Sequence, residues 1–268
     1  MICLDNLPEL RPFPTVATRL LTACDNPEVD PSEISEIVQC DPSYVVKLLK
    51  VANSSMFSTM NAVVTVDEAI VILGFRTIRN LILGISAGEV FGGNTPEAKR
   101  LWKHTLGCAT VARVVAPHVD VKPDEAFLAG ILHDVGKIVF FDMAEKEYIQ
   151  ATANANALNI LEIEQETFGT THHELGLRCA EEWGLPFDFN EAISCHHTPE
   201  EAVEAFDLVG VTSIANCMAH HWGLCGQVQE QEVDQILERT ELDLKRDLLD
   251  GLQEQVLEEL TSVQSMCS

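Results

Sequence analysis

The chain has 268 residues, of which 46% are hydrophobic and 22% are charged, as in an ordinary globular protein. Its formal net charge of −25 is unusual. A surface this acidic repels phosphate backbones and anionic lipid head groups, so the charge disfavours nucleic-acid binding and attachment to membrane surfaces. No stretch approaches the roughly 18 uninterrupted apolar residues of a membrane span.

The nine cysteines are scattered and form no Cys-x-x-Cys pair. This pattern is typical of free thiols in a reducing compartment rather than of a disulfide framework. The amino terminus also lacks the basic and apolar segments of a signal peptide. We therefore expect a cytoplasmic protein.

Residues 1–93 contain short helical patterns and no strand pattern. Prolines 8, 12 and 14 predict an irregular arm. The segments Asp30-Pro31-Ser32 and Asp41-Pro42-Ser43 each predict a helix start with proline in the first turn, and Ser32 is the expected cap of the first. Together these residues predict a helical N-terminal subdomain.

Two further helices are expected before residue 93. One runs from Val66 to Leu73, and the next runs from Thr77 to Val90. The segment Gly92-Gly93-Asn94 predicts the end of the second helix, because glycine pairs commonly follow a periodic apolar run.

Residues 94–226 predict a second group of helices. Thr95-Pro96-Glu97 begins a long helix with His104 in its middle. Lys122-Pro123-Asp124 begins another helix, and His133-Asp134 lies at its end. Later helices are expected at residues 144–157, from after Gly176 to Trp183, and at residues 190–196 and 206–221.

From residue 227 to residue 268 the chain is acidic, and its leucines recur at helical spacing. This pattern predicts two amphipathic helices. They could cap the helical bundle or bind a partner protein.

Histidines near helix ends form the main candidate site. The positions are His104, His133-Asp134, His172 or His173, and His196-His197. A lone histidine is usually a surface or hydrogen-bonded core residue, but three paired positions beside apolar residues favour a convergent site. Imidazole and carboxylate ligands together suit Fe, Mn, Ni or Zn.

Other histidines and cysteines carry less weight. We expect His118, His220 and His221 on the surface, because no carboxylate lies beside them. Cys195 is the thiol of most interest, because it precedes His196.

Several longer motifs carry a family resemblance. They are Leu101-Trp102-Lys103-His104, residues 126–137 (AFLAGILHDVGK), residues 168–176 (FGTTHHELG), Trp183-Gly184-Leu185-Pro186, residues 192–197 (AISCHH), Leu7-Pro8, Asp41-Pro42, residues 48–54 (LLKVANS) and residues 69–74 (AIVILG). Over about residues 7–222 the chain resembles the HDOD family, the HD-related output domains of bacterial signalling proteins. The resemblance implies an all-α protein, in which a helical N-terminal subdomain packs on an HD-domain-like bundle related to metal-dependent phosphohydrolases and HD-GYP phosphodiesterases.

The resemblance also implies two metal positions that share one carboxylate. A first metal would be bound by His104, His133, Asp134 and a later aspartate. A second metal would be bound by Asp134, His172, His196 and His197. In an active relative the metals lower the pKa of a bound water that attacks a phosphodiester. Asp134 and Lys137 would be the catalytic residues, with Lys137 holding a phosphate oxygen.

The sequence departs from the enzymatic pattern in three places. Asn216 stands where the later aspartate is expected, and a neutral amide is a weaker ligand. Arg100 stands four residues before His104, where HD-GYP enzymes resemble one another in having an acidic ligand. Thr198-Pro199-Glu200 replaces the GYP signature, which argues against a phosphodiesterase of that kind.

Three functions are compatible with these features. The favoured one is a signalling output or scaffold module that binds a partner protein, is catalytically degenerate and has one metal ion, two or none. The alternative is a metal-dependent phosphohydrolase acting on a nucleotide or phosphodiester. The third is a nucleotide or phosphate sensor without turnover. We expect a single HDOD-type unit made of residues 1–93, the metal-site residues 94–226 and the acidic helices of residues 227–268.

Overall fold

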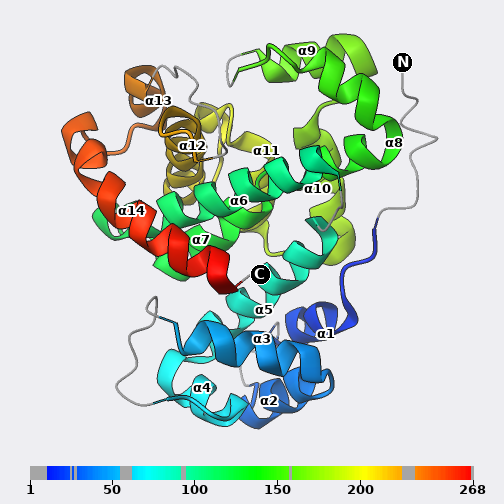
Figure 1. The fold of residues 1–268 in the computed structure, drawn as a ribbon, viewed down its shortest axis with the longest axis vertical. Coiled ribbons are helices and arrows are strands. Elements are labelled where there is room, and N and C mark those ends of the chain that lie inside the picture. The colour runs from blue at the N-terminus through cyan, green and yellow to red at the C-terminus, as the bar shows by residue number, and fades with distance from the viewer. Residues whose placement is uncertain are drawn as a thin grey trace.

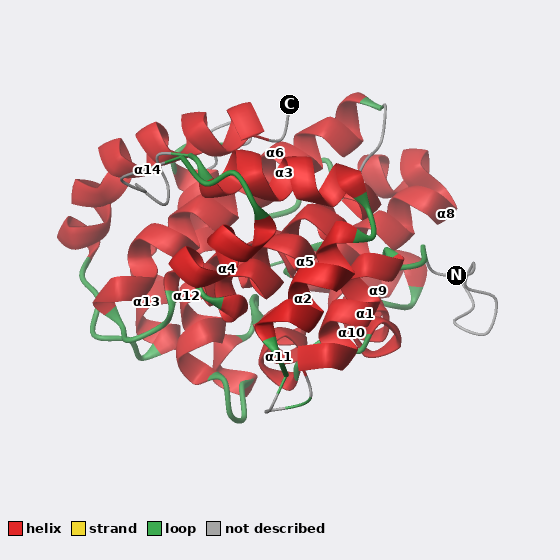
Figure 2. Ribbon diagram, turned by 90° about the horizontal axis from the view of Figure 1, so that it is seen from below, coloured by secondary structure: helices red, strands yellow, loops and turns green. Residues whose placement is uncertain are grey.

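The computed structural model describes residues 11–24, 26, 29–54, 62–91, 95–156, 159–224 and 233–266. Within these ranges the regular elements are helices and none is a strand (Figure 1, Figure 2), so the predicted all-α fold is confirmed. The first helices are α1 (Thr15–Cys24), α2 (Pro31–Gln39), α3 (Pro42–Ala52), α4 (Val66–Leu73) and α5 (Phe75–Phe91). The others are α6 (Pro96–Val115), α7 (Pro123–Leu132), α8 (Val135–Ala151), α9 (Ile160–Phe168), α10 (His172–Trp183), α11 (Phe187–Cys195), α12 (Phe206–His221), α13 (Val233–Thr240) and α14 (Arg246–Met266).

Some predicted features fall outside these ranges. They are Leu7-Pro8, Gly92-Gly93-Asn94, Ala157 and the beginning of the acidic segment at residues 227–232. Residues 11–14 are not helical, as their prolines predict. This arm is held by Phe13, whose ring stacks on Trp183 with 4.6 Å between centroids, and by the Arg11 guanidinium, which binds Asp142.

Side chains at the helix starts explain several boundaries. Ser32 was predicted to cap α2, but the cap is Asp30, whose carboxylate accepts the backbone N–H of Ser32. Asp30 directly precedes Pro31, which is the first residue of the helix, so Asp30 is the residue whose side chain can reach the free N–H groups of the first turn. Both α4 and α10 begin with a capping box, formed by Thr65 with Glu68 and by Thr171 with Glu174.

Two hydrophobic clusters meet at α5. Ile78, Leu81 and Ile82 pack with α1–α4, whereas Leu83 and Ala87 pack with the core of the later helices. Figure 1 shows α1–α4 grouped at one end of the molecule, with α5 leading from them toward α6–α12. The helices α6, α7, α10 and α11 lie on the far side of α5 from α2–α4 (Figure 1).

The helix that follows Asp134 differs from the prediction of a helix at residues 144–157. It begins at Val135 and ends at Ala151, and Ala144 interrupts it with non-helical φ and ψ values of −156° and 48°. Residues 135–143 are mostly apolar and largely buried. A helix that is apolar on nearly all sides shows no amphipathic period, so the sequence pattern did not predict this one.

The helices α8 and α10 approach closely enough for their backbones to touch. A Cβ atom on Gly136 would overlap the carbonyl oxygen of His172 and lie 2.6 Å from the backbone nitrogen of Gly176. Glycine is therefore required at position 136 by space. The contact brings the segment after Asp134 against the start of α10, where His172 lies.

The acidic C-terminal segment forms two helices where it is described, as predicted. Arg239 of α13 binds Glu200 and the carbonyl of His197, and α14 lies along α6 (Figure 1). Among the described helices, none alone has the length and hydropathy to cross a membrane. The helices α4 and α5 pass that test only as a pair, and they are bent by 118° relative to each other.

Candidate metal centre

The carboxylate of Asp134 is at the centre of the candidate site. Asp134 lies between α7 and α8, and its side chain and that of His133 are fully buried. This junction explains why adjacent residues can serve one site, since α7 ends at Leu132 and α8 begins at Val135.

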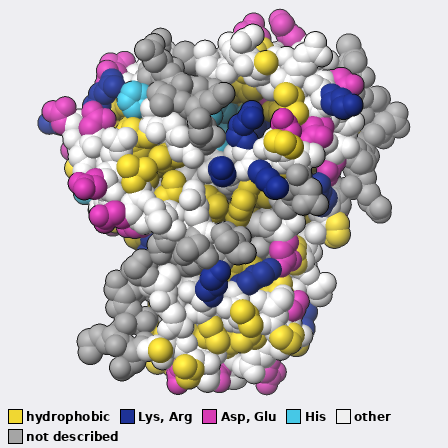
Figure 3. Space-filling view, viewed as in Figure 1, with side chains coloured by type: hydrophobic (Ala, Val, Ile, Leu, Met, Phe, Trp, Pro, Cys, Tyr) yellow, Lys and Arg dark blue, Asp and Glu magenta, His cyan; other side chains and the backbone are white. Residues whose placement is uncertain are grey.

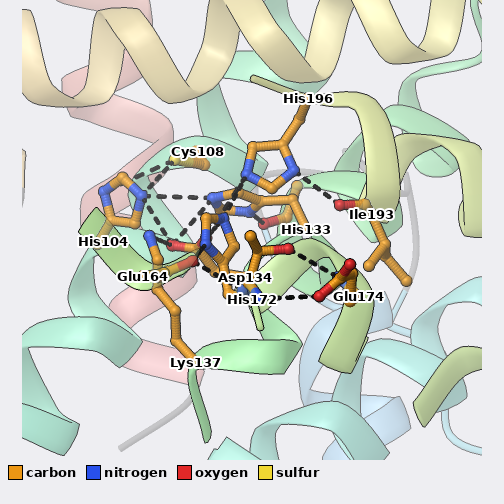
Figure 4. Close-up of polar contacts among 12 residues, drawn as sticks. His104, Cys108, His133, Asp134, Lys137, Glu164, His172, Glu174, Ile193 and His196 are labelled. Atoms are coloured by element: carbon orange, nitrogen blue, oxygen red, sulfur yellow. Dashed lines mark hydrogen bonds and ion pairs between the residues drawn. The ribbon is translucent and has the colours of Figure 1, made fainter. Parts of the chain in front are cut away.

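Four imidazole rings are directed toward this carboxylate (Figure 4). The Nε2 atoms of His133 and His104 lie 3.3 and 3.5 Å from Oδ2, and 3.3 Å from each other. The Nε2 atoms of His172 and His196 each lie 3.6 Å from Oδ1, and 3.4 Å from each other. Each carboxylate oxygen thus faces one pair of histidines.

The other ring nitrogens have outward partners. Nδ1 of His133 contacts the carbonyl oxygen of Gly130 at 2.8 Å, and Nδ1 of His196 contacts that of Ile193 at 3.0 Å. A carbonyl only accepts, so Nδ1 carries the hydrogen in both rings. The neutral ring therefore has its lone pair on Nε2, toward Asp134.

His172 is oriented by a residue that the sequence analysis did not identify. The carboxylate of Glu164, on α9, is fully buried and accepts from Nδ1 and from the backbone N–H of His172, both at 2.7 Å. It also accepts the hydroxyl of Tyr148 at 2.6 Å. Such a carboxylate–histidine pair fixes the tautomer of a metal-binding ring.

Burial governs the charge of the rings. It lowers the pKa of His104 and His197 well below the usual value, and that of His196 to about 3. These rings are therefore neutral at pH 7. Burial raises the pKa of Asp134, but His133 and the Lys137 ammonium outweigh it, and the net pKa lies well below its usual range.

Lys137 is one turn along α8 from Asp134. Its Nζ lies 2.7 Å from Oδ2, on the side of His104 and His133. In contrast, Oδ1 is buried and accepts no hydrogen bond from the described residues. The Nε2 atoms of His172 and His196 lie 3.6 Å from Oδ1, and these nitrogen atoms carry lone pairs as Oδ1 does.

The remaining predicted ligand, His197, is buried next to these rings. Its ring centroid lies 5.2 Å from that of His172, and its Nε2 has no hydrogen-bond partner among the described residues. His173 was the alternative to His172 as a ligand, and its Nε2 also has no hydrogen-bond partner among the described residues. Donor atoms of His172, His173, His196 and His197 all lie within 4.8 Å of one another.

One expectation about another residue was wrong, and one thiol near the site was missed. His220 was expected on the surface, but its ring packs on His104 with 4.4 Å between centroids, and burial lowers its pKa to about 4. Its place one turn after Asn216 on α12 is the signal that could have found it. Cys195 was singled out, yet the thiol that contacts the site is Cys108, 3.4 Å from Nε2 of His104.

A cavity of about 420 Å³ opens onto the centre. Its lining includes the buried His104 and Asp134, the half-buried Lys137 and the exposed Arg100. Figure 3 shows Lys and Arg side chains gathered on this face, over α6. The cavity therefore brings two cationic side chains, Arg100 and Lys137, and the carboxylate of Glu97 to the same space as the buried Asp134.

The residues fit a metal ion by their chemistry. An orphaned carboxylate oxygen and converging Nε2 lone pairs repel one another unless a cation lies between them. Imidazole and carboxylate ligands suit Fe, Mn, Ni and Zn.

Comparison with known proteins identifies the family. The HDOD domain model matches residues 10–199. The chain belongs to the HDOD family. An uncharacterized protein from Treponema pallidum (strain Nichols) is 27% identical over 218 residues, which are 80% of this HDOD chain and 42% of that protein. The chain thus spans less than half of the length of this relative.

Solved structures show the same fold. An HDOD domain protein of unknown function from Geobacter sulfurreducens has a TM-score of 0.79 at 21% identity, covering 98% of this chain and 95% of that one. A suspected phosphohydrolase from Shewanella amazonensis SB2B has a TM-score of 0.75 at 24% identity, covering 98% and 94%.

Proposed function

We propose that this chain is a signal-transduction output module of the HDOD type that holds a divalent transition metal on Asp134 and acts through a protein partner. The observation that carries the metal proposal is the orientation of four Nε2 atoms around one buried carboxylate. Outward acceptors hold three of these rings in place, so the site is organised before a cation arrives.

The proposed ligands divide between the two carboxylate oxygens. His104, His133 and Asp134 would hold one ion. Asp134, His172, His196 and His197 would hold a second. Fe, Mn, Ni and Zn are the candidate metals.

A signalling role without turnover is supported by the first of these positions. Lys137 already neutralises Oδ2 there, and Asn216 brings no charge. A metal ion at this position would have little negative charge around it. Such an ion is suited to holding helices together or to binding an anion, rather than to turnover. Membership of the HDOD family supports the same role.

A protein partner would find apolar side chains on the N-terminal helices. Val71, Ile72 and Phe75 are 85%, 52% and 39% exposed around the bend between α4 and α5. Figure 3 shows hydrophobic side chains clustered over this end of the molecule. Exposed apolar residues that adjoin one another are typical of protein contact surfaces.

A metal-dependent phosphohydrolase is the second candidate, and the cavity favours it. When bound, the metal would supply a water of lowered pKa. Lys137 and Arg100 would bind phosphate oxygens, since both line the cavity above Asp134. A nucleotide or phosphate sensor would bind its ligand through the same side chains, Lys137 and Arg100, without turnover.

One assay separates the hydrolase from the two candidates that work without turnover. The metal-loaded chain is incubated with bis-p-nitrophenyl phosphate beside an Asp134→Ala variant. The signalling module predicts the same background rate for both proteins. Turnover that the variant abolishes would refute the non-catalytic proposal in favour of the hydrolase.

A further inference from the structure

The cavity that opens onto Asp134 runs along α6 and α8. On α6 it is lined by Glu97, seven residues before His104, and on α8 by Phe141, seven residues after Asp134. At a rise of about 1.5 Å per residue, each of these two side chains starts about 10 Å along its helix from the candidate metal centre. His104 and Asp134 are buried, whereas Glu97 and Phe141 are partly exposed. The cavity therefore has a buried end at the centre and a more exposed end between Glu97 and Phe141.

Two cationic side chains line the cavity between these ends. Arg100 is four residues before His104, and Lys137 is three residues after Asp134. Arg100 forms no ion pair with a described carboxylate, although Glu97 is one turn away on the same helix. Lys137 binds Oδ2 of Asp134, and an ammonium group has further N–H donors for a ligand. Both side chains can therefore donate to an anion in the cavity.

The charges that line the cavity indicate which anion fits. Arg100 and Lys137 balance Glu97 and Asp134. Burial lowers the pKa of the lining histidines, so their rings are neutral at pH 7. A divalent metal ion on Asp134 would thus leave an excess of positive charge. A phosphate monoester matches this excess, because it carries about −1.5 to −2 charges at pH 7.

The more exposed end of the cavity suits a flat organic group. The ring of Phe141 is held edge-on to that of Tyr148, with 5.7 Å between centroids, and Ile149 and Ile160 add apolar lining. Nucleobases stack on aromatic side chains of this kind. The carboxylate of Glu97 has no hydrogen-bond partner among the described residues, so it can accept from an amino or hydroxyl group of a ligand.

We infer that the cavity binds a nucleoside monophosphate, with its phosphate between Arg100, Lys137 and the metal and its base against Phe141. Inorganic phosphate would leave the Phe141 end empty, and a nucleoside would leave the cationic part without an anion. A cavity of about 420 Å³ is of the size that holds a small organic ligand. Binding of this kind rests on the proposed metal centre and would give the signalling module a ligand that it senses without turnover.

Isothermal titration calorimetry tests this binding on the full chain, after its metal content has been measured. The metal-loaded protein is titrated with each of the four common ribonucleoside monophosphates, with inorganic phosphate and with adenosine. We expect a nucleotide to bind about tenfold or more tightly than phosphate or adenosine, because the stacking of one base typically contributes that much. Nucleotides that all bind no more tightly than phosphate would overturn the inference while the metal centre stands.

Two variants locate the nucleotide within the cavity. Phe141→Ala should lower nucleotide affinity about tenfold and retain phosphate affinity. Glu97→Gln keeps the shape of the side chain, removes its charge and should reduce the preference for nucleotide over phosphate. Phe187→Ala is the matched control, because Phe187 is 52% exposed and is not among the residues that line the cavity.

The nucleotide does not bind in this orientation if Phe141→Ala and Glu97→Gln both keep the wild-type ratio of the two affinities. A chain that takes up no metal would refute the proposed centre and nucleotide binding together.

Discussion

At the scale of the residue, Glu164 has the clearest indirect role. Its carboxylate accepts a hydrogen bond from Nδ1 of His172. Because Nδ1 then carries the hydrogen, the lone pair of the neutral His172 ring is on Nε2. Burial raises the pKa of Glu164, but its contacts with His172 and Tyr148 outweigh burial and lower it. The carboxylate is therefore ionised at neutral pH and able to accept both bonds.

Glu164→Gln should weaken metal binding about tenfold or more, because outer partners of metal-binding histidines typically contribute 10- to 100-fold to affinity. Competition with a chromogenic chelator measures this affinity. Glu191→Gln is the matched control, since Glu191 accepts backbone N–H groups of Val203, Glu204 and Ala205 instead. Equal loss of affinity in both variants would mean that Glu164 acts only through stability.

At the scale of the element, the start of α10 positions His172. The hydroxyl of Thr171 accepts the N–H of Glu174, and Thr65 makes the same bond to Glu68 at the start of α4. The two capping boxes are alike, but only one of them precedes a proposed ligand.

Thr171→Ala and Thr65→Ala should each lower the free energy of unfolding by about 1 kcal/mol, as for the loss of a helix cap. Only Thr171→Ala should also weaken metal binding, because His172 is the first residue of its helix. Urea denaturation and chelator competition measure the two effects. The account of α10 fails if Thr65→Ala weakens metal binding as much.

The backbone contact of α8 with α10 gives a second test. Gly136→Ala should destabilise the fold by roughly 1–3 kcal/mol and weaken metal binding, because the added methyl group overlaps the carbonyl of His172. Gly251→Ala in α14 has open space and should stabilise by up to about 1 kcal/mol. Thermal unfolding measures both, and a Gly136→Ala protein as stable as wild type would contradict the packing described.

Local signals predicted the helices but not every contact between them. Proline and capping residues predict the starts of α2, α3 and α6 because these signals act within one turn. Glu164, Cys108 and His220 were missed because their roles depend on which helices pack together, and no local spacing encodes that. The positions His104, His133-Asp134, His172 and His196 were found from their pairing beside apolar residues together with motif resemblance, and the structure brings them together. Their ligand roles, and the division at residues 93 and 226, remain predictions.

At the scale of the whole molecule, a metal at the centre would tie α6, α7, α10 and α11 together. A ligand that binds only the folded state stabilises it by about 2.7 kcal/mol when its free concentration is 100 times Kd. For a chain of this size, that free energy corresponds to a Tm rise of about 5–10 °C. Removal of metal with a chelator should therefore lower Tm by that amount in differential scanning calorimetry, and unchanged Tm would contradict the structural role of the metal.

The central claim is that Asp134 and the surrounding histidines bind a divalent transition metal. The most direct measurement is the metal content, by mass spectrometry, of protein supplied with Fe, Mn, Ni and Zn and then freed of excess metal. The account predicts at least one tightly bound ion per wild-type chain and only a trace in a folded Asp134→Asn variant, which keeps the shape of the side chain and removes its charge. Wild-type protein that holds only a trace of each metal, or a variant that holds as much as wild type, would contradict it.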